Sequence, residues 1–198
     1  MYFFLLSIVS AYYKFFFGAE FYGTKNIPQK GGVLILANHL SNNDPPIITT
    51  HIPRKLTFMA KKELFKIPLL GSFVKSCGAF PIDRSVSDIS AVRTALKLLK
   101  EGNALMMFPE GRRNKEFVSS KIKPGALTIA SKAGVPILPV YIEGKYRLFG
   151  KTKIYYGKPI PPEKIQELIK SASENTADKT TIMSDFIYNS ILSSREDF

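Results

Sequence analysis

The chain alternates short apolar runs with segments in which apolar residues recur every three to four positions. A continuous apolar run is typical of a strand that is buried on both faces of a sheet, as parallel strands are. The clearest such run, Val33–Ala37, follows two glycines. Further runs predict strands at residues 56–60, 79–83, 104–108, 136–142 and 153–156.

Helices are predicted where the apolar residues keep a helical period. The first can be capped by Ser85 and ends near Gly102, because serine favours helix starts and glycine favours helix ends. We expect its buried face to carry Ile89, Val92, Leu96 and Leu99. Three more helices are predicted at residues 126–132, 163–170 and 182–192, with a polar linker at 171–180.

The alternation of strands and helices predicts the fold class. We expect an α/β fold: a single layered domain with a mixed, partly parallel sheet. A length of 198 residues fits one domain. We divide the chain into an N-terminal helix at residues 1–20 and a domain at residues 21–198. Ligands of such sheets bind where strands end, so the residues that follow each strand are the candidate site.

The N-terminal segment is apolar and aromatic but short. A membrane-spanning helix needs about 20 apolar residues, whereas this run stops at residue 13 and is followed by Lys14. No basic residue precedes it, which argues against a secretory signal. Its Phe and Tyr residues favour a helix that lies in a membrane interface. The alternative is a helix that packs on the protein core.

The charge of the chain indicates an anionic partner. Lys and Arg number 28 against 16 acidic residues, which gives a formal charge of +12. Nucleic acid, a membrane surface and a phosphorylated substrate all fit such a charge. No helix-turn-helix or RNA-recognition pattern is present, so we expect no nucleic-acid partner. Cys77 is the single cysteine, which excludes an intramolecular disulfide framework and argues against a cysteine metal site.

A basic surface is predicted at residues 54–75, on both sides of the predicted strand at 56–60. There, lysines and arginines alternate with apolar residues, as on a surface that faces an anionic lipid leaflet. The alternative is an ordinary solvated face. The basic residues are Arg54, Lys55, Lys61, Lys62, Lys66 and Lys75.

The strand at Val33–Ala37 is followed by His39 and, five residues later, Asp44. Histidine is the side chain best suited to take a proton near neutral pH, and a carboxylate on its second nitrogen would fix its tautomer. The pair can meet only across a loop or a helix start. Ser41-x-x-Asp44 followed by Pro45 is also typical of a helix start, with Ser41 as its cap. The spacing leaves both interpretations open.

The strand at 104–108 is followed by Glu110, Gly111, Arg112 and Arg113. Glycine lets the backbone approach a ligand closely, and adjacent arginines can hold a phosphate through bidentate bonds. Glu110 can accept a hydrogen bond from a hydroxyl group or orient an arginine. The alternative is an exposed turn with solvated charges.

Two further cations occupy comparable positions. Arg84 follows the strand at 79–83, and Lys123 precedes a predicted helix start, where backbone N–H groups favour anions. The chain contains no phosphate-loop or dinucleotide motif and no nucleophile elbow. Any anion site is therefore built from arginine and lysine side chains.

Four blocks in a fixed order carry a family resemblance. They are Asn38-His39-Leu40-Ser41-Asn42-Asn43-Asp44-Pro45, Gly78-Ala79-Phe80-Pro81-Ile82-Asp83-Arg84, Phe108-Pro109-Glu110-Gly111-Arg112-Arg113 and Val135-Pro136-Ile137-Leu138-Pro139-Val140. With them the chain resembles the glycerolipid acyltransferases, and within these the lysophosphatidic acid acyltransferases of the PlsC type. The resemblance covers residues 25–156, about two thirds of the chain.

The resemblance implies an activity and its substrates. The reaction would transfer an acyl chain to the free hydroxyl of lysophosphatidic acid and so make phosphatidic acid. The donor would be a thioester of acyl carrier protein or coenzyme A, with no further cofactor and no metal. The site would need a base for the hydroxyl and donors for the oxyanion, for which backbone N–H groups near a strand end are candidates.

The resemblance also assigns roles to residues. His39 would be the general base and Asp44 its orienting partner. The acceptor's glycerol phosphate would contact Glu110, Arg113 and Arg84, with Lys123 at a further basic position. The family often has Thr or Ser in place of Arg112, where an added cation could strengthen phosphate binding or alter head-group choice.

Both substrates are amphiphiles, so the membrane is an expected partner. We expect a monotopic or peripheral protein on the cytoplasmic face of the cell membrane. Two alternatives remain at this point: an acyltransferase for a different lysolipid, and a basic membrane-binding module without catalysis.

Overall fold

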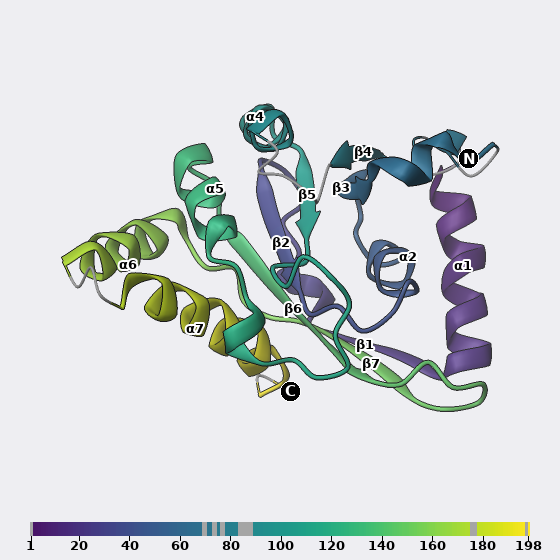
Figure 1. The fold of residues 1–198 in the computed structure, drawn as a ribbon. Helices are drawn as coiled ribbons and strands as arrows, with labels where there is room; N and C mark the ends of the chain where they lie inside the picture. The colour runs from purple at the N-terminus through teal and green to yellow at the C-terminus, as the bar shows by residue number, and fades with distance from the viewer. Residues whose placement is uncertain are drawn as a thin grey trace.

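The computed structural model describes residues 2–68, 71–72, 75, 78–82, 89–174, 178–196 and 198. A seven-stranded mixed sheet runs through the middle of the molecule (Figure 1). Its strands, in chain order, are β1 (Ala19–Tyr22), β2 (Val33–Ala37), β3 (Leu56–Lys61), β4 (Ala79–Ile82), β5 (Ala104–Met107), β6 (Ile137–Gly144) and β7 (Thr152–Tyr156). The α/β fold class expected from the sequence is confirmed.

The order of the strands places several chain segments at one edge of the sheet. The order is β1-β7-β6-β2-β5-β3-β4, and β6, β2, β5, β3 and β4 all run parallel. Among the strand pairs of the described residues, β6–β7 alone is antiparallel. The segments that follow β2 and β5 therefore leave the sheet side by side, because neighbouring parallel strands end at the same edge.

Helices cover both faces of the sheet (Figure 1). The alternating side chains of the buried strands point to two separate apolar clusters, one on each face. One face carries α1 (Tyr2–Phe17) and α2 (Asp44–Thr49). The other carries α4 (Ile89–Lys100), α5 (Gly125–Ala133), α6 (Pro162–Glu174) and α7 (Lys179–Leu192).

Helix α1 uses only one side to pack on this core. Tyr13 is 4% exposed and Phe17 9%, and both belong to the apolar cluster on their face of the sheet. Phe4 and Phe15, on the opposite side of the helix, are 69% and 70% exposed. The interpretation of this segment as a helix packed on the core is therefore confirmed for one side of α1, and the membrane-interface interpretation stays a prediction for the exposed side. Among the described residues, no helix has both the length and the apolar character needed to cross a bilayer.

The structure corrects the predicted buried face of α4. Ile89 and Val92 are exposed, whereas Leu99 is buried as expected and Leu96 packs partly buried against the same cluster. Ala91 and Ala95 take the remaining buried positions of the helix, where their small side chains allow it to lie close to the sheet. The proposed cap, Ser85, lies outside the described residues.

Other boundaries also differ from the expectation. The linker predicted at 171–180 is helical at both ends, since α6 continues to Glu174 and α7 begins at Lys179. Strand β1 was not predicted, because its four residues show no clear alternation.

Ser41 does not cap α2: the cap position is Asn43, and its side chain makes no capping bond. The hydroxyl of Ser41 instead accepts a hydrogen bond from the Asn43 N–H.

Candidate functional site

His39 and Asp44 lie against each other at the carboxyl end of β2. Because Asp44 opens α2, the loop at residues 38–43 turns the chain back and brings the two side chains together. Nδ1 of His39 is 2.8 Å from Oδ2 of Asp44. The two residues are 7% and 0% exposed. The sequence spacing did not decide whether these two side chains meet, and the structure shows that they are in contact.

The Asp44 carboxylate accepts three further hydrogen bonds. The backbone N–H groups of Leu40 and Ser41 donate to Oδ2 at 2.7 and 2.8 Å. The hydroxyl of Tyr146 donates to Oδ1 at 2.7 Å. These bonds hold the carboxylate in place, so that its contact with His39 fixes the orientation of the imidazole.

The opposite nitrogen of His39 is the reactive one in this geometry. An ionised carboxylate only accepts hydrogen bonds, so Nδ1 carries a proton and Nε2 keeps a free lone pair. The ring stacks on Phe108, with centroids 3.9 Å apart and planes 15° apart. None of the residues that the structure describes hydrogen-bonds to Nε2. The arrangement can take a proton from a hydroxyl group placed at Nε2.

Glu110 ties the loop after β5 to the loop after β2. Its carboxylate accepts the backbone N–H of His39 at 2.8 Å and the side-chain N–H of Asn114 at 2.5 Å. The backbone N–H of Asn114 in turn donates to the backbone carbonyl of His39 at 3.0 Å. Burial raises the pKa of Glu110, while the hydrogen bonds from His39 and Asn114 oppose that effect. Glu110 is 3% exposed, so its geometry supports positioning of His39 rather than contact with a ligand.

The same hydrogen bonds restrict where an oxyanion could bind. The backbone N–H of His39 is taken by Glu110, and those of Leu40 and Ser41 are taken by Asp44. The backbone amides of His39, Leu40 and Ser41 are therefore not available to a substrate.

The basic candidates lie on the loop after β5 and just beyond it. Arg112 and Arg113 are exposed. The ammonium of Lys123 lies 3.6 Å from the point where a Cβ on Gly111 would stand, and Gly111 has a φ of +69°. A side chain at Gly111 would be strained because of this backbone conformation, and its Cβ would lie in ordinary contact with the lysine. Cations thus surround the turn that holds Glu110, whereas Arg84 lies outside the described residues.

Besides Asn114, sequence reasoning missed the roles of Asn38 and Tyr146 in the site. Asn38 is buried and exchanges two hydrogen bonds with the backbone of Ile142, at 2.7 and 3.0 Å, which joins the end of β2 to β6. Tyr146 comes from the β6–β7 loop, 102 positions from the Asp44 that it contacts. Burial, chiefly, and the nearby Asp44 charge raise the pKa of Tyr146, so its hydroxyl stays a donor. Asn38 could have been proposed as a site residue because it directly follows the predicted strand at Val33–Ala37. No local sequence pattern indicates Tyr146.

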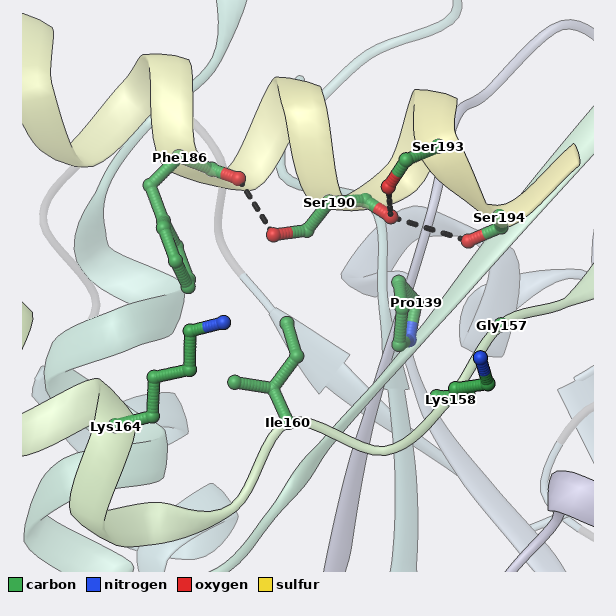
Figure 2. Close-up of a pocket in the computed structure, with 9 residues that line it drawn as sticks. All are labelled: Pro139, Gly157, Lys158, Ile160, Lys164, Phe186, Ser190, Ser193 and Ser194. Carbon is green, nitrogen blue, oxygen red and sulfur yellow. Dashed lines mark hydrogen bonds between the residues drawn. The ribbon is translucent and has the colours of Figure 1, made fainter. Parts of the chain in front are cut away.

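A cavity of about 160 Å³ lies elsewhere, between α7 and the chain that follows β7 (Figure 2). Three serines of its wall donate to backbone carbonyls of their own helical segment: Ser190 to Phe186, and Ser193 and Ser194 to Ser190. Pro139, Ile160 and Phe186 form much of the remaining wall. The cavity contains no residue able to act as a general base at neutral pH, so we do not assign the reaction to it.

The predicted basic surface is only partly available to a ligand. The guanidinium of Arg54 donates to the carbonyls of Gly31 and Gly102, which lie at the amino ends of β2 and β5. Lys61 lies 3.6 Å from Glu63 as an exposed ion pair. Arg54 therefore closes turns at the edge of the sheet opposite to His39.

Comparison with known proteins places the chain among enzymes. The family model "Acyltransferase" matches residues 18–143. The 1-acyl-sn-glycerol-3-phosphate acyltransferase of Bacillus subtilis is 38% identical over 151 residues, which are 72% of this chain and 74% of that protein. The enzyme of the same name from Streptococcus pneumoniae is 34% identical over 169 residues, 81% of this chain and 62% of that protein.

A solved structure agrees with these matches. The crystal structure of the 1-acyl-sn-glycerophosphate acyltransferase PlsC from Thermotoga maritima superimposes with a TM-score of 0.66 and 29% identity, covering 87% of this chain and 80% of that one. The resemblance drawn from the four sequence blocks is confirmed. The chain therefore belongs to the acyltransferase family.

Proposed function

We propose that the chain transfers an acyl group from a thioester of acyl carrier protein or coenzyme A to the free hydroxyl of 1-acyl-sn-glycerol-3-phosphate. The observation that carries the proposal is the buried His39–Asp44 contact at the carboxyl edge of the sheet. It is supported by relatives named for this reaction at 38% and 34% identity. Membership of an enzyme family sets aside the alternative of a binding module without catalysis.

The residues support a direct transfer between the two substrates. Nε2 of His39 takes the proton of the acceptor hydroxyl, and the oxygen attacks the thioester carbonyl. The tetrahedral intermediate then expels the thiolate as the C–S bond breaks. The protonated His39 returns its proton to this leaving group, while Asp44 stabilises the imidazolium in between. No acyl-enzyme is needed, because a thioester is already an activated acyl group.

The acceptor's phosphate is assigned to the cations around the Glu110 turn. Arg112, Arg113 and Lys123 are exposed there, and arginine binds phosphate through charge-assisted bidentate bonds. The family resemblance adds Arg84 to this group. Glu110 is assigned a positioning role, because both of its oxygens accept hydrogen bonds within the protein.

A membrane surface is proposed as the place of the reaction. The exposed aromatic side of α1 and the basic charge of the chain support contact with an anionic leaflet without crossing it. The cytoplasmic leaflet fits donors such as acyl carrier protein and coenzyme A.

The test is release of free thiol from an acyl thioester in the presence of lysophosphatidic acid. We expect release with this acceptor and much less with a monoacylglycerol, which lacks the phosphate. Equal rates with both acceptors, or release only with a different lysolipid, would contradict the proposed substrate.

The phosphate assignment makes its own prediction in the same assay. Arg113→Ala should lower kcat/KM for the phosphorylated acceptor by about 10–150-fold, since a lost charge-assisted bond is worth about 1.5–3 kcal/mol. The KM for the acyl donor serves as the internal control, and exposed Arg93→Ala on α4 is the matched variant. A rise in donor KM instead would assign Arg113 to the carrier's phosphate.

A further inference from the structure

One side of α1 leaves a line of large apolar residues exposed along the helix. Phe4 is 69% exposed, Ile8 52%, Tyr12 48% and Phe15 70%. At 100° per residue these four positions fall within a sector of about 80°. Their side faces away from the core, because Tyr13 and Phe17 on the other side are buried.

A second exposed apolar group comes from the β6–β7 loop. Leu148 is 66% exposed and Phe149 76%, at the tip of the loop at residues 145–151. Phe149 has a φ of +57°, a left-handed backbone conformation that a non-glycine residue adopts only when its surroundings hold it. The loop thus keeps a large aromatic ring in solvent and in a strained conformation. This feature is unfavourable unless the ring has a partner.

Contacts with the end of α1 hold the loop in this conformation. The Phe149 N–H donates to the Phe16 carbonyl at 2.6 Å. The Phe149 ring lies 6.4 Å from the ring of Phe15 and 6.3 Å from that of Phe16. A Cβ at Gly18 would collide with the carbonyl oxygen of Gly150, so glycine allows the close approach. The loop tip and the exposed side of α1 therefore form one continuous surface, which we call the apolar face: Phe4, Ile8, Tyr12, Phe15, Leu148 and Phe149.

The charges around the apolar face identify its partner. Lys14 on α1 and Lys145, Arg147 and Lys151 on the loop are all exposed. No acidic residue occurs in residues 1–19 or in the loop at residues 145–151. Aromatic and aliphatic side chains on segments that also carry exposed lysine and arginine suit the boundary between acyl chains and anionic headgroups. An apolar protein partner would need no such cations.

We propose that the β6–β7 loop is a second lipid-docking element, which inserts Leu148 and Phe149 into an anionic membrane surface beside α1. The loop leaves β6 at the carboxyl edge of the sheet, the edge that holds His39. Docking through both elements turns this edge toward the lipid in which the acceptor of the proposed function resides. The inference goes beyond an N-terminal anchor because it adds a second, distant contact that fixes the orientation of the site.

A single tryptophan can report this contact, because the chain contains none. We would place it at the loop with Phe149→Trp and, as a matched control, on the opposite layer with Val92→Trp, which replaces another exposed apolar residue. Full-length protein is mixed with vesicles of phosphatidylglycerol and phosphatidylcholine that contain brominated lipid. We expect a blue shift and quenching for Phe149→Trp and neither for Val92→Trp. Absence of quenching at the loop would overturn the proposal.

The contribution of the loop to binding is measured by co-sedimentation with the same vesicles. Leu148→Ser combined with Phe149→Asn removes both apolar groups, and asparagine tolerates the left-handed backbone. Ile89→Ser combined with Val92→Asn is the matched control on α4. We expect the loop variant to bind about tenfold more weakly, from the apolar area it loses, and the control to bind like the native chain. Equal binding by the loop variant and the native chain would contradict the proposal.

The test is independent of the proposed function on which the orientation argument rests. The vesicles hold no substrate, so a chain that docks through the loop but transfers no acyl group would refute the proposed function alone. Activity adds a second readout: the loop variant should have a higher KM for lysophosphatidic acid in vesicles. Its rate with a short-chain, water-soluble acceptor should equal that of the native chain. A matching loss on the soluble acceptor would show a damaged fold and overturn the docking interpretation.

Discussion

At the scale of single residues, the site is organised around the Asp44 carboxylate. It contacts His39, two backbone N–H groups of the intervening loop, and the hydroxyl of Tyr146. A buried carboxylate needs such donors to stay charged, and each of them also limits its movement. Asp44 can therefore orient the His39 ring without having to be reoriented during the reaction.

Tyr146 tests whether this orientation matters. Tyr146→Phe removes one donor from Asp44 while it keeps the ring that packs against Tyr13 and Phe17. We expect kcat to fall about 3–10-fold, since a hydrogen bond of about 0.5–1.5 kcal/mol is lost, and the acceptor KM to stay unchanged. A variant with native kcat would limit Tyr146 to packing.

At the scale of elements, α1 has a structural side and a free side. The structural side lies next to the site, because Tyr13 donates to the Asn43 side chain at 3.2 Å and Phe17 packs on Tyr146. Deletion of residues 1–17 would therefore expose the partners of Asp44, and would not isolate the effect of membrane contact. Single substitutions on the two sides separate stability from docking.

Phe17 and Phe15 provide the matched pair for this separation. Phe17→Ala should lower the free energy of unfolding by about 3 kcal/mol, because it removes a buried ring. Phe15→Ala should change it by less than about 0.5 kcal/mol, since that ring is 70% exposed. Denaturant unfolding in the absence of lipid measures both. Equal losses would show that the two sides of α1 are not distinct.

The elements that the sequence predicted well are those with a strong local pattern. β2 was predicted over its full length because five consecutive apolar residues follow two glycines, and the structure shows all five to be buried. The face of α4 was predicted correctly for Leu96 and Leu99 and wrongly for Ile89 and Val92, because local periodicity does not show whether the neighbouring layer leaves room for alanine or for isoleucine. Strand β1 follows an apolar helix after one residue, and its pairing with β7 comes from a distant segment.

The candidate site shows the same division. His39, Asp44 and Glu110 follow predicted strands, so their meeting at one sheet edge could be inferred from topology. Tyr146 and Asn114 could not be found in this way, because their contacts depend on how two loops fold over that edge. The inward orientation of Glu110 likewise needed the structure, since a strand-end carboxylate can equally point toward a ligand.

At the scale of the whole molecule, stability should depend on pH through His51. The His51 ring is partly buried and stacks on the ring of Phe21, with the two ring centroids 3.6 Å apart. Burial, with a smaller effect from Lys14, lowers the pKa of His51 from 6.5 to about 4. The folded state therefore resists protonation that the unfolded chain accepts. The stability contributed by the neutral ring is present above pH 6.5 and is lost as pH falls toward 4.

The size of this effect is modest because the ring is partly in contact with solvent. Without solvent screening, the lowered pKa of His51 would correspond to a loss of about 3 kcal/mol in the free energy of unfolding. With screening we expect a loss of about 1–2 kcal/mol. His51→Phe keeps the stacking on Phe21 and removes the titration. Unfolding free energies measured from pH 7 to pH 4 should therefore fall less steeply in the variant. Parallel slopes for the native chain and the variant would refute this origin of acid sensitivity.

At the scale of the whole molecule, the fold also places His39 at the carboxyl edge of the sheet, where the loops proposed to bind phosphate and lipid lie as well. His39 lies between the cations around Glu110 and the loop that carries Tyr146 and Phe149. Phosphate recognition, proton transfer and lipid contact are thereby assigned to neighbouring loops of one sheet edge. Proton transfer by His39 is the step on which the proposed reaction depends most.

That step is tested most directly by thiol release from an acyl thioester and lysophosphatidic acid, catalysed by His39→Ala. Loss of a general base costs about 10²–10⁴-fold, so we expect kcat to fall by at least about 100-fold. Vesicle binding and the free energy of unfolding of the same variant serve as controls and should remain close to those of the native chain. Turnover by a folded His39→Ala variant at the native rate would contradict His39 as the base.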